Sequence, residues 1–316
     1  MTIARAQQRF VERPWGVGDV RPWSATVSNG KIIGEIWYEL PIGIRMEPSL
    51  LMKLLFTSEA LSIQVHPDDQ HAQAMGLANG KTEAWYVLDA ASNAQVGIGL
   101  KQQYSNNELR QAISDGTISD LVAWRNVATG RALLVPAGTI HAIGAGLVVA
   151  EIQQRSEATF RLFDYGRRRE LHVDAGLAVA NPGPAGEQAD PMRLTSERTL
   201  LVSSPHFVFE RIELPGETSW SLEVEPETWC LVVGGHGMLA SLDVAKGDGI
   251  FVRADRVQLA TDHVGMTLLL AYSGSSPIPN LLRKLEPESA AQSRRQNANR
   301  DQPWNVITRD SRGAKG

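Results

Sequence analysis

Residues 130–141 read Gly-Arg-Ala-Leu-Leu-Val-Pro-Ala-Gly-Thr-Ile-His. The apolar run before Pro136 predicts a short β-strand, and the sequence Pro-Ala-Gly predicts a tight turn that ends it. His141 follows directly after that turn. This segment therefore predicts a strand and a turn that bring a candidate ligand, His141, to a defined place in a β-fold.

Short stretches of the same kind recur on both sides of this segment, separated by glycine and proline. Many short strands punctuated in this way favour a β-sandwich or a barrel. The strands expected before the centre of the chain are 31–40, 50–56, 61–66, 83–88 and 131–135. Those expected after it are 207–214, 219–224, 228–233, 250–252, 257–260 and 266–271.

Helical signals are fewer and lie close together. Ser105 and Glu108 form a capping-box pattern, and Thr117 with Asp120 repeats the pattern before the apolar residues that begin at Leu121. We therefore expect a fold dominated by β-structure, with a small helical insertion at about residues 101–125.

A composition break divides the predicted strands into two groups. Residues 181–191 are rich in proline and glycine, as linkers are. We predict a first domain over residues 1–185 that contains the helical insertion and a smaller second β domain over 186–285. Residues 286–316 are polar and predict a flexible tail, in which Trp304 has no evident role.

Composition excludes several classes of protein. The 316 residues include 31 Lys and Arg against 35 Asp and Glu, a net charge of −4, so neither nucleic acid nor an anionic membrane is an expected partner. The single cysteine, Cys230, rules out intramolecular disulfides and cysteine-based metal sites and is expected in the core. The sequence shows no secretory signal and no apolar run of roughly 20 residues, so we expect a cytoplasmic protein. It predicts no oligomeric state.

Polar side chains with ligand chemistry recur on several of the predicted strands. Alternation places Ser62, Gln64 and His66 on one strand face. By the same rule, Lys81 and Glu83 share a face near the start of another strand. If these strands converge with His141 inside a barrel, the glutamine, two histidines and glutamate suit a divalent cation, most often Zn²⁺. Structural zinc sites are usually rich in cysteine, so a ligand set without cysteine favours a catalytic zinc site.

The spacing Gly-x5-Pro-x-Gly-x2-His over residues 130–141 resembles the second conserved motif of cupins, which are double-sheet jelly rolls. The first cupin motif normally supplies two histidines one residue apart and then a glutamate. Here Gln64 takes the place of the first histidine, a replacement that resembles the type I phosphomannose isomerases. Further segments that resemble that family, in order, are Arg13-Pro-Trp-Gly16, Ser62 to Asp69, Gly80 to Glu83 and Glu151 to Arg167.

This resemblance implies two cupin-like jelly-roll domains, the second degenerate and without metal. It also implies interconversion of mannose 6-phosphate and fructose 6-phosphate with one zinc ion per chain. The implied zinc ligands are Gln64, His66, Glu83 and His141. Arg161 falls on the family's catalytic arginine. The positions that line the sugar-phosphate pocket are Ser62, Lys81 and Arg167.

The implied chemistry moves a proton between two carbons beside a carbonyl, through an enediolate-like anion. Zinc can polarise the sugar oxygens, and Arg161 can donate to the developing oxyanion. Lys81 and Arg167 can bind the phosphate. The identity of the base is open: Glu151 is one candidate and a metal-bound water another, while Glu151 could equally be a structural carboxylate. Metal-directed hydride transfer also stays open.

Two other functions are compatible with these residues. One is an isomerase of a related, unphosphorylated sugar, and the other is a non-catalytic cupin that binds a sugar or a metal as a sensor. A cupin oxygenase would use iron or manganese and usually more histidines, which the glutamine at position 64 disfavours.

Overall fold

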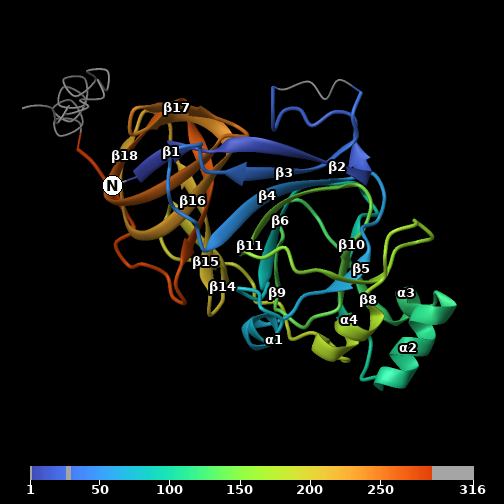
Figure 1. The fold of residues 1–316 in the computed structure, drawn as a ribbon. Coiled ribbons are helices and arrows are strands. Elements are labelled where there is room, and N and C mark those ends of the chain that lie inside the picture. The colour runs from blue at the N-terminus through green and yellow to red at the C-terminus, as the bar shows by residue number, and fades with distance from the viewer. Residues whose placement is uncertain (1, 26–29, 287–316) are drawn as a thin grey trace, which may run out of the picture.

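The computed structural model describes residues 2–25 and 30–286. Within these ranges the chain forms strands β1 to β19 and four short helices, so the predicted β-dominated fold with two cupin-like units is confirmed. Figure 1 shows the two β units side by side, with α2, α3 and α4 grouped at the end of one of them. Apart from residue 286, the predicted tail with Trp304 lies outside the described residues.

The first unit consists of two antiparallel sheets. The six-stranded sheet has the order β2-β3-β4-β11-β6-β9, and the five-stranded sheet has the order β12-β5-β10-β7-β8. The strands of the first sheet are β2 (Gln7–Val17), β3 (Ile33–Glu39), β4 (Leu50–Thr57), β6 (Glu83–Ala90), β9 (Ala132–Val135) and β11 (Leu147–Gln154). Those of the second are β5 (Ile63–Val65), β7 (Gln95–Leu100), β8 (Val122–Asn126), β10 (His141–Ile143) and β12 (Phe160–Phe163).

The second unit is an eight-stranded sheet that also takes in the start of the chain, because β1 pairs with β18. Its strands are β1 (Thr2–Arg5), β13 (Met192–Arg193), β14 (Arg198–Ser203), β15 (Phe207–Leu214), β16 (Ser219–Leu239), β17 (Leu242–Ala245), β18 (Gly249–Ser273) and β19 (Leu282–Lys284). The domain limits at residues 185 and 285 stay a prediction.

Two strands of this unit are longer than the sequence pattern predicts. The separate strands expected at 219–224 and 228–233 are one strand, β16, and those expected at 250–252, 257–260 and 266–271 are β18. Both strands bend through register shifts instead of ending, and Thr228 pairs with both Val252 and Tyr272. Local composition cannot distinguish a bend of this kind from a turn, because both interrupt the alternation.

The helices are α1 (Asp69–Ala74), α2 (Asn106–Asp115), α3 (Ile118–Leu121) and α4 (Val173–Val179). The Ser105 and Glu108 capping box is present, which confirms the prediction for α2. The second predicted box is wrong: Thr117 precedes α3 in a helical conformation and makes no side-chain cap bond. No helix of the described ranges is long and apolar enough to span a membrane.

The hydrophobic cores explain why the two units form one body. One core joins β3 and β4 to β15, β16 and β18 across the boundary between the units, through side chains such as Tyr38, Trp229 and Phe251. A Cβ atom on Gly249 would lie 2.3 Å from the Tyr38 ring, so the glycine permits this close packing. Separate cores fill the interior of the second unit and the space between the five-stranded sheet and the helices. Cys230 is buried in the core of the second unit, as predicted.

Candidate active site

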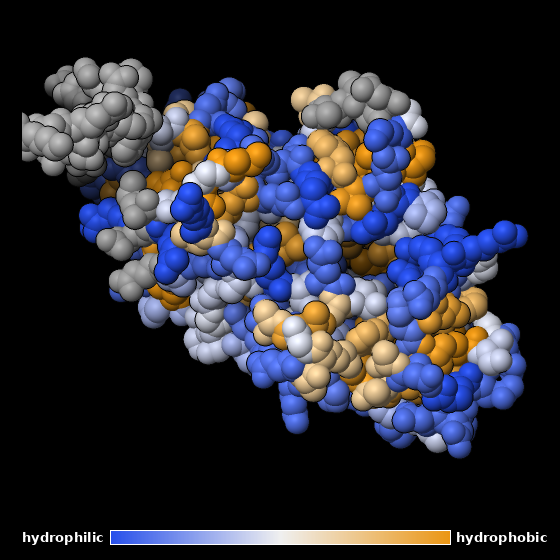
Figure 2. All heavy atoms as spheres, viewed as in Figure 1, coloured by the Kyte–Doolittle hydropathy of each residue, from blue (hydrophilic) through white to orange (hydrophobic). Residues whose placement is uncertain are grey.

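A cavity of about 360 Å³ lies between the two sheets of the first unit, a volume suited to a small molecule. Most of its lining residues are inward-facing side chains of β2, β3, β4, β6 and β11 from one sheet and of β5, β10 and β12 from the other. Figure 2 shows hydrophilic residues over most of the visible face and a hollow beneath the β2–β3 hairpin, where apolar residues are recessed. Among the predicted site residues, Ser62, Gln64, Lys81, Glu83, His141 and Arg161 line the cavity.

His66, Glu83 and His141 form the candidate metal centre. Their ligand atoms all lie within 4.8 Å of one another, and all three side chains are buried. His66 Nε2 lies 3.4 Å from Glu83 Oε2, and His141 Nε2 lies 3.4 Å from Glu83 Oε1. Strand register explains the arrangement, because His141 on β10 is paired directly with Gln64 on β5, while β6 presents Glu83 from the facing sheet.

Backbone carbonyls hold both imidazoles in the form that a metal requires. His66 Nδ1 donates to the Ala158 carbonyl and His141 Nδ1 to the Thr139 carbonyl, each at 2.8 Å. These partners leave both Nε2 atoms as acceptors that face Glu83, as in metal-binding histidines whose other ring nitrogen donates to a carbonyl that fixes the ring. Glu83 Oε2 is buried and forms an ion pair with Lys81 Nζ at 2.9 Å, with no further partner except the facing imidazole within the described structure. The donor set therefore fits a divalent cation.

Burial and charge give the three side chains the protonation states of metal ligands. Burial, together with the charge of Lys81, lowers the pKa of His66 to about 3. Burial likewise lowers the pKa of His141. For Glu83 burial acts in the opposite direction, but the surrounding groups, with the charge of Lys81 first among them, outweigh it and hold the pKa well below its usual value. Neutral imidazoles and an ionised carboxylate are the forms that bind metal.

Lys81, Ser62 and Gln64 lie around this centre. Lys81 Nζ is 2.9 Å from Glu83 Oε2 and 3.0 Å from His66 Nε2. Ser62 Oγ donates to Gln64 Oε1 at 3.0 Å, and Gln64 Nε2 donates to His141 Nε2 at 3.3 Å. The alternation predicted for residues 61–66 is confirmed, since Ile63 and Val65 pack in a core on the opposite face.

Glu151, on β11, also lines the cavity. Its Oε2 accepts from Trp85 Nε1 at 3.2 Å, and Lys53 Nζ is 3.4 Å from Oε1. Burial and the nearby charge of Glu83 raise the pKa of Glu151. Burial lowers the pKa of Lys53. A buried carboxyl with a raised pKa in a cavity has the properties of a general acid or base.

The two arginines predicted for the site differ in their surroundings. Arg161 lines the cavity, and its Nε is buried without a hydrogen-bond partner in the described structure. Arg167 is not among the lining residues, because its guanidinium binds Asp164, Glu59 and the Ala60 carbonyl. Arg169, two residues further, lines the cavity in its place.

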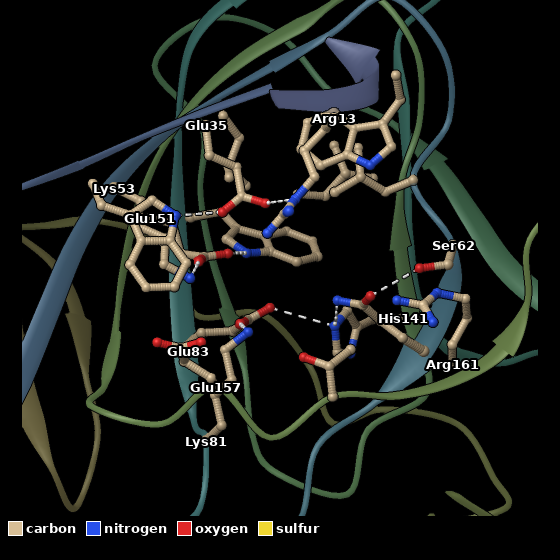
Figure 3. A pocket seen from close by; sticks show the side chains of 18 of the residues that line it. Arg13, Glu35, Lys53, Ser62, Lys81, Glu83, His141, Glu151, Glu157 and Arg161 are labelled. Atoms are coloured by element: carbon tan, nitrogen blue, oxygen red, sulfur yellow. Dashed lines mark hydrogen bonds and ion pairs between the residues drawn. The ribbon is translucent and has the colours of Figure 1, made fainter. Parts of the chain in front are cut away.

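Several lining residues were not identified from sequence. They are Arg13, Trp15, Glu35, Trp37, Lys53, Glu157 and Arg169. A signal existed for two of them, since Lys53 and Glu35 are charged residues inside otherwise apolar strands and are almost completely buried. Charged side chains are rarely buried without a partner, so such positions indicate an ion pair or a site. Figure 3 shows Glu35, Lys53 and Glu151 together on one wall, opposite Arg161 and Ser62.

The chain is similar in sequence and in fold to known proteins. The chain is 35% identical to a mannose-6-phosphate isomerase from Streptococcus mutans over 64% of its own length and 67% of that protein. It is 32% identical to a putative mannose-6-phosphate isomerase from Bacillus subtilis over 76% and 82% of the two chains. The crystal structure of a mannose 6-phosphate isomerase from Bacillus subtilis superimposes with a TM-score of 0.74 and 25% identity, covering 86% and 100%. No protein-family model matches the chain.

The jelly-roll sheets and the buried His-Glu-His cluster between them define a cupin-type protein with a metal site. Together with the identities above, this places the chain in the mannose-6-phosphate isomerase family.

Proposed function

We propose that this chain is a zinc-dependent isomerase that interconverts mannose 6-phosphate and fructose 6-phosphate. The observation that carries the proposal is the meeting of Gln64, Glu83 and His141 with Arg161 in one cavity, with His66 buried beside them. The relatives named mannose-6-phosphate isomerase support the same reaction.

The proposed metal is one zinc ion per chain, held by Gln64, His66, Glu83 and His141. Two imidazoles, a carboxylate and an amide oxygen suit a borderline cation with room for a further oxygen ligand. Ligation through Gln64 Oε1 requires its amide to turn over, which would leave Nε2 to donate to Ser62 Oγ. A structurally similar isomerase is described as bound with zinc and yttrium. When bound, zinc supplies Lewis-acid polarisation of the sugar oxygens.

The side chains around this site have matching roles. Arg161 would donate to the oxyanion that develops as the proton moves, and its unpartnered, buried Nε is available for that bond. Glu151 would carry the proton, because it is a buried carboxyl in the same cavity whose pKa is raised above its usual value. Ser62 and Lys81 would line the pocket for the sugar phosphate, next to the metal centre. We do not assign Arg167 to substrate contact, since its guanidinium is engaged outside the cavity lining.

The cavity's charge favours a phosphorylated sugar over a neutral one. Five of its lining residues are cationic, and four are carboxylates that mostly pair with them. The cationic residues are Arg13, Lys53, Lys81, Arg161 and Arg169. Arg161 has no carboxylate within ion-pair distance among the described residues, so its charge is available to an anion.

Removal of the metal tests the function directly. Treatment with EDTA is expected to abolish conversion of mannose 6-phosphate to fructose 6-phosphate, and added zinc should restore it, because the Lewis-acid polarisation of the sugar oxygens is lost with the metal. A coupled assay of fructose 6-phosphate before and after chelation measures this. Full activity in a preparation shown to be metal-free would contradict the proposal, and so would no activity with zinc bound.

Arg161→Ala is expected to lower kcat by about 100- to 1,000-fold, the usual effect of removing a donor to a developing oxyanion. Its zinc content should equal that of the wild type, since Arg161 is not a ligand. Arg110→Ala is a matched control, because Arg110 forms an exposed ion pair with Asp174 outside the cavity. An unchanged kcat in Arg161→Ala would remove this residue from the catalytic assignment.

A further inference from the structure

Arg13 enters the cavity from a local irregularity of β2. The pairing of β2 with β3 shifts between Val11 and Glu12 and again between Glu12 and Val17, so residues 13–16 lie outside the regular ladder. An irregularity of this kind re-aims side chains that would otherwise alternate across the sheet. Arg13 is among the residues that line the cavity.

Gly34 on β3 makes room for the stem of Arg13. A Cβ atom at residue 34 would lie 2.4 Å from Arg13 Cβ and 2.6 Å from its Cγ, and 2.8 Å from the Trp15 ring. No side chain larger than hydrogen fits there without displacing Arg13. The glycine thus lets the arginine lie across the strand.

Glu35 holds the guanidinium by one edge. Arg13 Nε donates to Glu35 Oε1 at 2.6 Å, and Trp37 Nε1 donates to Glu35 Oε2 at 2.5 Å. Burial alone would raise the pKa of Glu35, but Lys53 and Arg13 outweigh it and keep the carboxylate ionised. Neither terminal nitrogen of Arg13 has a hydrogen-bond partner in the described part of the chain. Figure 3 shows the guanidinium extending from β2 into the cavity beside Glu35.

Two further arginines face the same space. Arg161 has the unpartnered, buried Nε. Arg169 is held by Asp164 through Nε and Nη2, at 2.7 and 2.6 Å, and its Nη1 has no hydrogen bond to any of the described residues. Burial lowers the pKa of Arg161, and the positive charges of Arg169 and Arg13 lower it further. Three guanidinium groups that repel one another in a cavity would be stabilised together by a dianion.

We propose that Arg13, positioned by Glu35 and Gly34, is a specificity-determining residue that forms a clamp with Arg169 for the phosphate of the substrate, beside the guanidinium of Arg161. The inference rests on the proposed function and names the groups that select a phosphorylated sugar. Arginine suits this task because its planar fork binds phosphate oxygens bidentately.

The test compares Arg13→Met with Arg9→Met. Arg9 lies on the same strand and makes an Arg–Glu bond of the same length, 2.6 Å to Glu39, but does not line the cavity. In Arg13→Met, the KM for mannose 6-phosphate and the inhibition constant of inorganic phosphate are expected to rise about 10- to 100-fold. Its kcat should stay within about threefold of the wild type. Arg9→Met should change neither constant.

Gly34→Ala is a second variant that keeps every charge and displaces Arg13. It is expected to raise the same two constants. If Arg13→Met leaves both constants within about twofold of the wild type, or lowers kcat with KM unchanged, Arg13 does not bind the phosphate of the substrate and the proposal is overturned. If Arg13→Met fails to fold, judged by circular dichroism, Gly34→Ala and Arg13→Lys decide by the same criteria.

The clamp can also be tested apart from the reaction. Calorimetric titration of the zinc-loaded protein with inorganic phosphate should detect binding that is lost in Arg13→Met and kept in Arg9→Met. A wild-type protein that binds phosphate but does not isomerise mannose 6-phosphate would retain the clamp and refute the proposed function. If the wild type isomerises mannose 6-phosphate and Arg13→Met binds inorganic phosphate as tightly as the wild type does, the clamp alone is refuted.

Discussion

Replacing His141 by alanine is expected to release the bound metal and to lower isomerase activity by more than about 100-fold. Loss of an outer partner of a metal ligand typically costs 10- to 100-fold in affinity or activity, and loss of the ligand itself should exceed that. His141 is 1% exposed, so no other side chain can enter its position from solvent. The variant also removes His141 Nε2, which lies 3.4 Å from Glu83 Oε1.

Metal per chain, measured by elemental mass spectrometry, and the coupled assay check this result together. His263→Ala is the control, because His263 is exposed and lies in the second unit on β18. It should retain both metal and activity. A His141→Ala protein that keeps one metal per chain and full turnover would remove His141 from the ligand set.

The second large effect concerns stability. Glu210→Ala is expected to lower the free energy of unfolding by about 3–5 kcal/mol, because it leaves the Arg198 guanidinium buried and unpaired. Arg198 and Glu210 are 2% and 0% exposed and form two bonds of 2.8 Å. Tyr272 also donates to Glu210 at 2.5 Å. The pair therefore joins β14, β15 and β18 inside the second unit.

Urea unfolding of Glu210→Ala beside Glu213→Ala measures this cost. Glu213 also pairs with an arginine, Arg211, but that pair is partly exposed and should contribute about 0–1 kcal/mol. The double substitution Arg198→Met with Glu210→Leu should recover much of the loss, since apolar replacement of a whole buried pair is often neutral. Equal destabilisation by Glu210→Ala and Glu213→Ala would contradict the argument.

Local sequence pattern was sufficient for the parts of the site that lie on single strands. The alternation from Ser62 to His66 determines which side chains share a face, because successive residues of a strand point to opposite sides. The Pro-Ala-Gly turn before His141 likewise places that histidine at the start of β10. The ligand chemistry of the metal centre followed from these positions and from the resemblance they carry.

The substrate end of the cavity was harder to predict. Arg167 and Arg169 lie in a run of three arginines with the same local pattern, yet only Arg169 lines the cavity. The difference arises from Glu59 and the Ala60 carbonyl, which bind Arg167 from a segment more than one hundred residues away. Arg13 belongs to the Arg-Pro-Trp-Gly motif, but the motif alone assigned it no role. Its position in the cavity depends on Glu35, which lies on a different strand.

By itself the sequence determined the β-dominated fold, the helical insertion and the residues with metal-binding chemistry. Each of these depends on neighbours within a few positions, where strand alternation, capping and turn preferences act. Only the tertiary structure decided that β1 joins the sheet of the second unit, that β16 and β18 run on through their bends, and that Arg13, Arg161 and Arg169 share one cavity. These depend on which distant strands pair and in what register, and that choice is made by burial and long-range packing rather than by local preference.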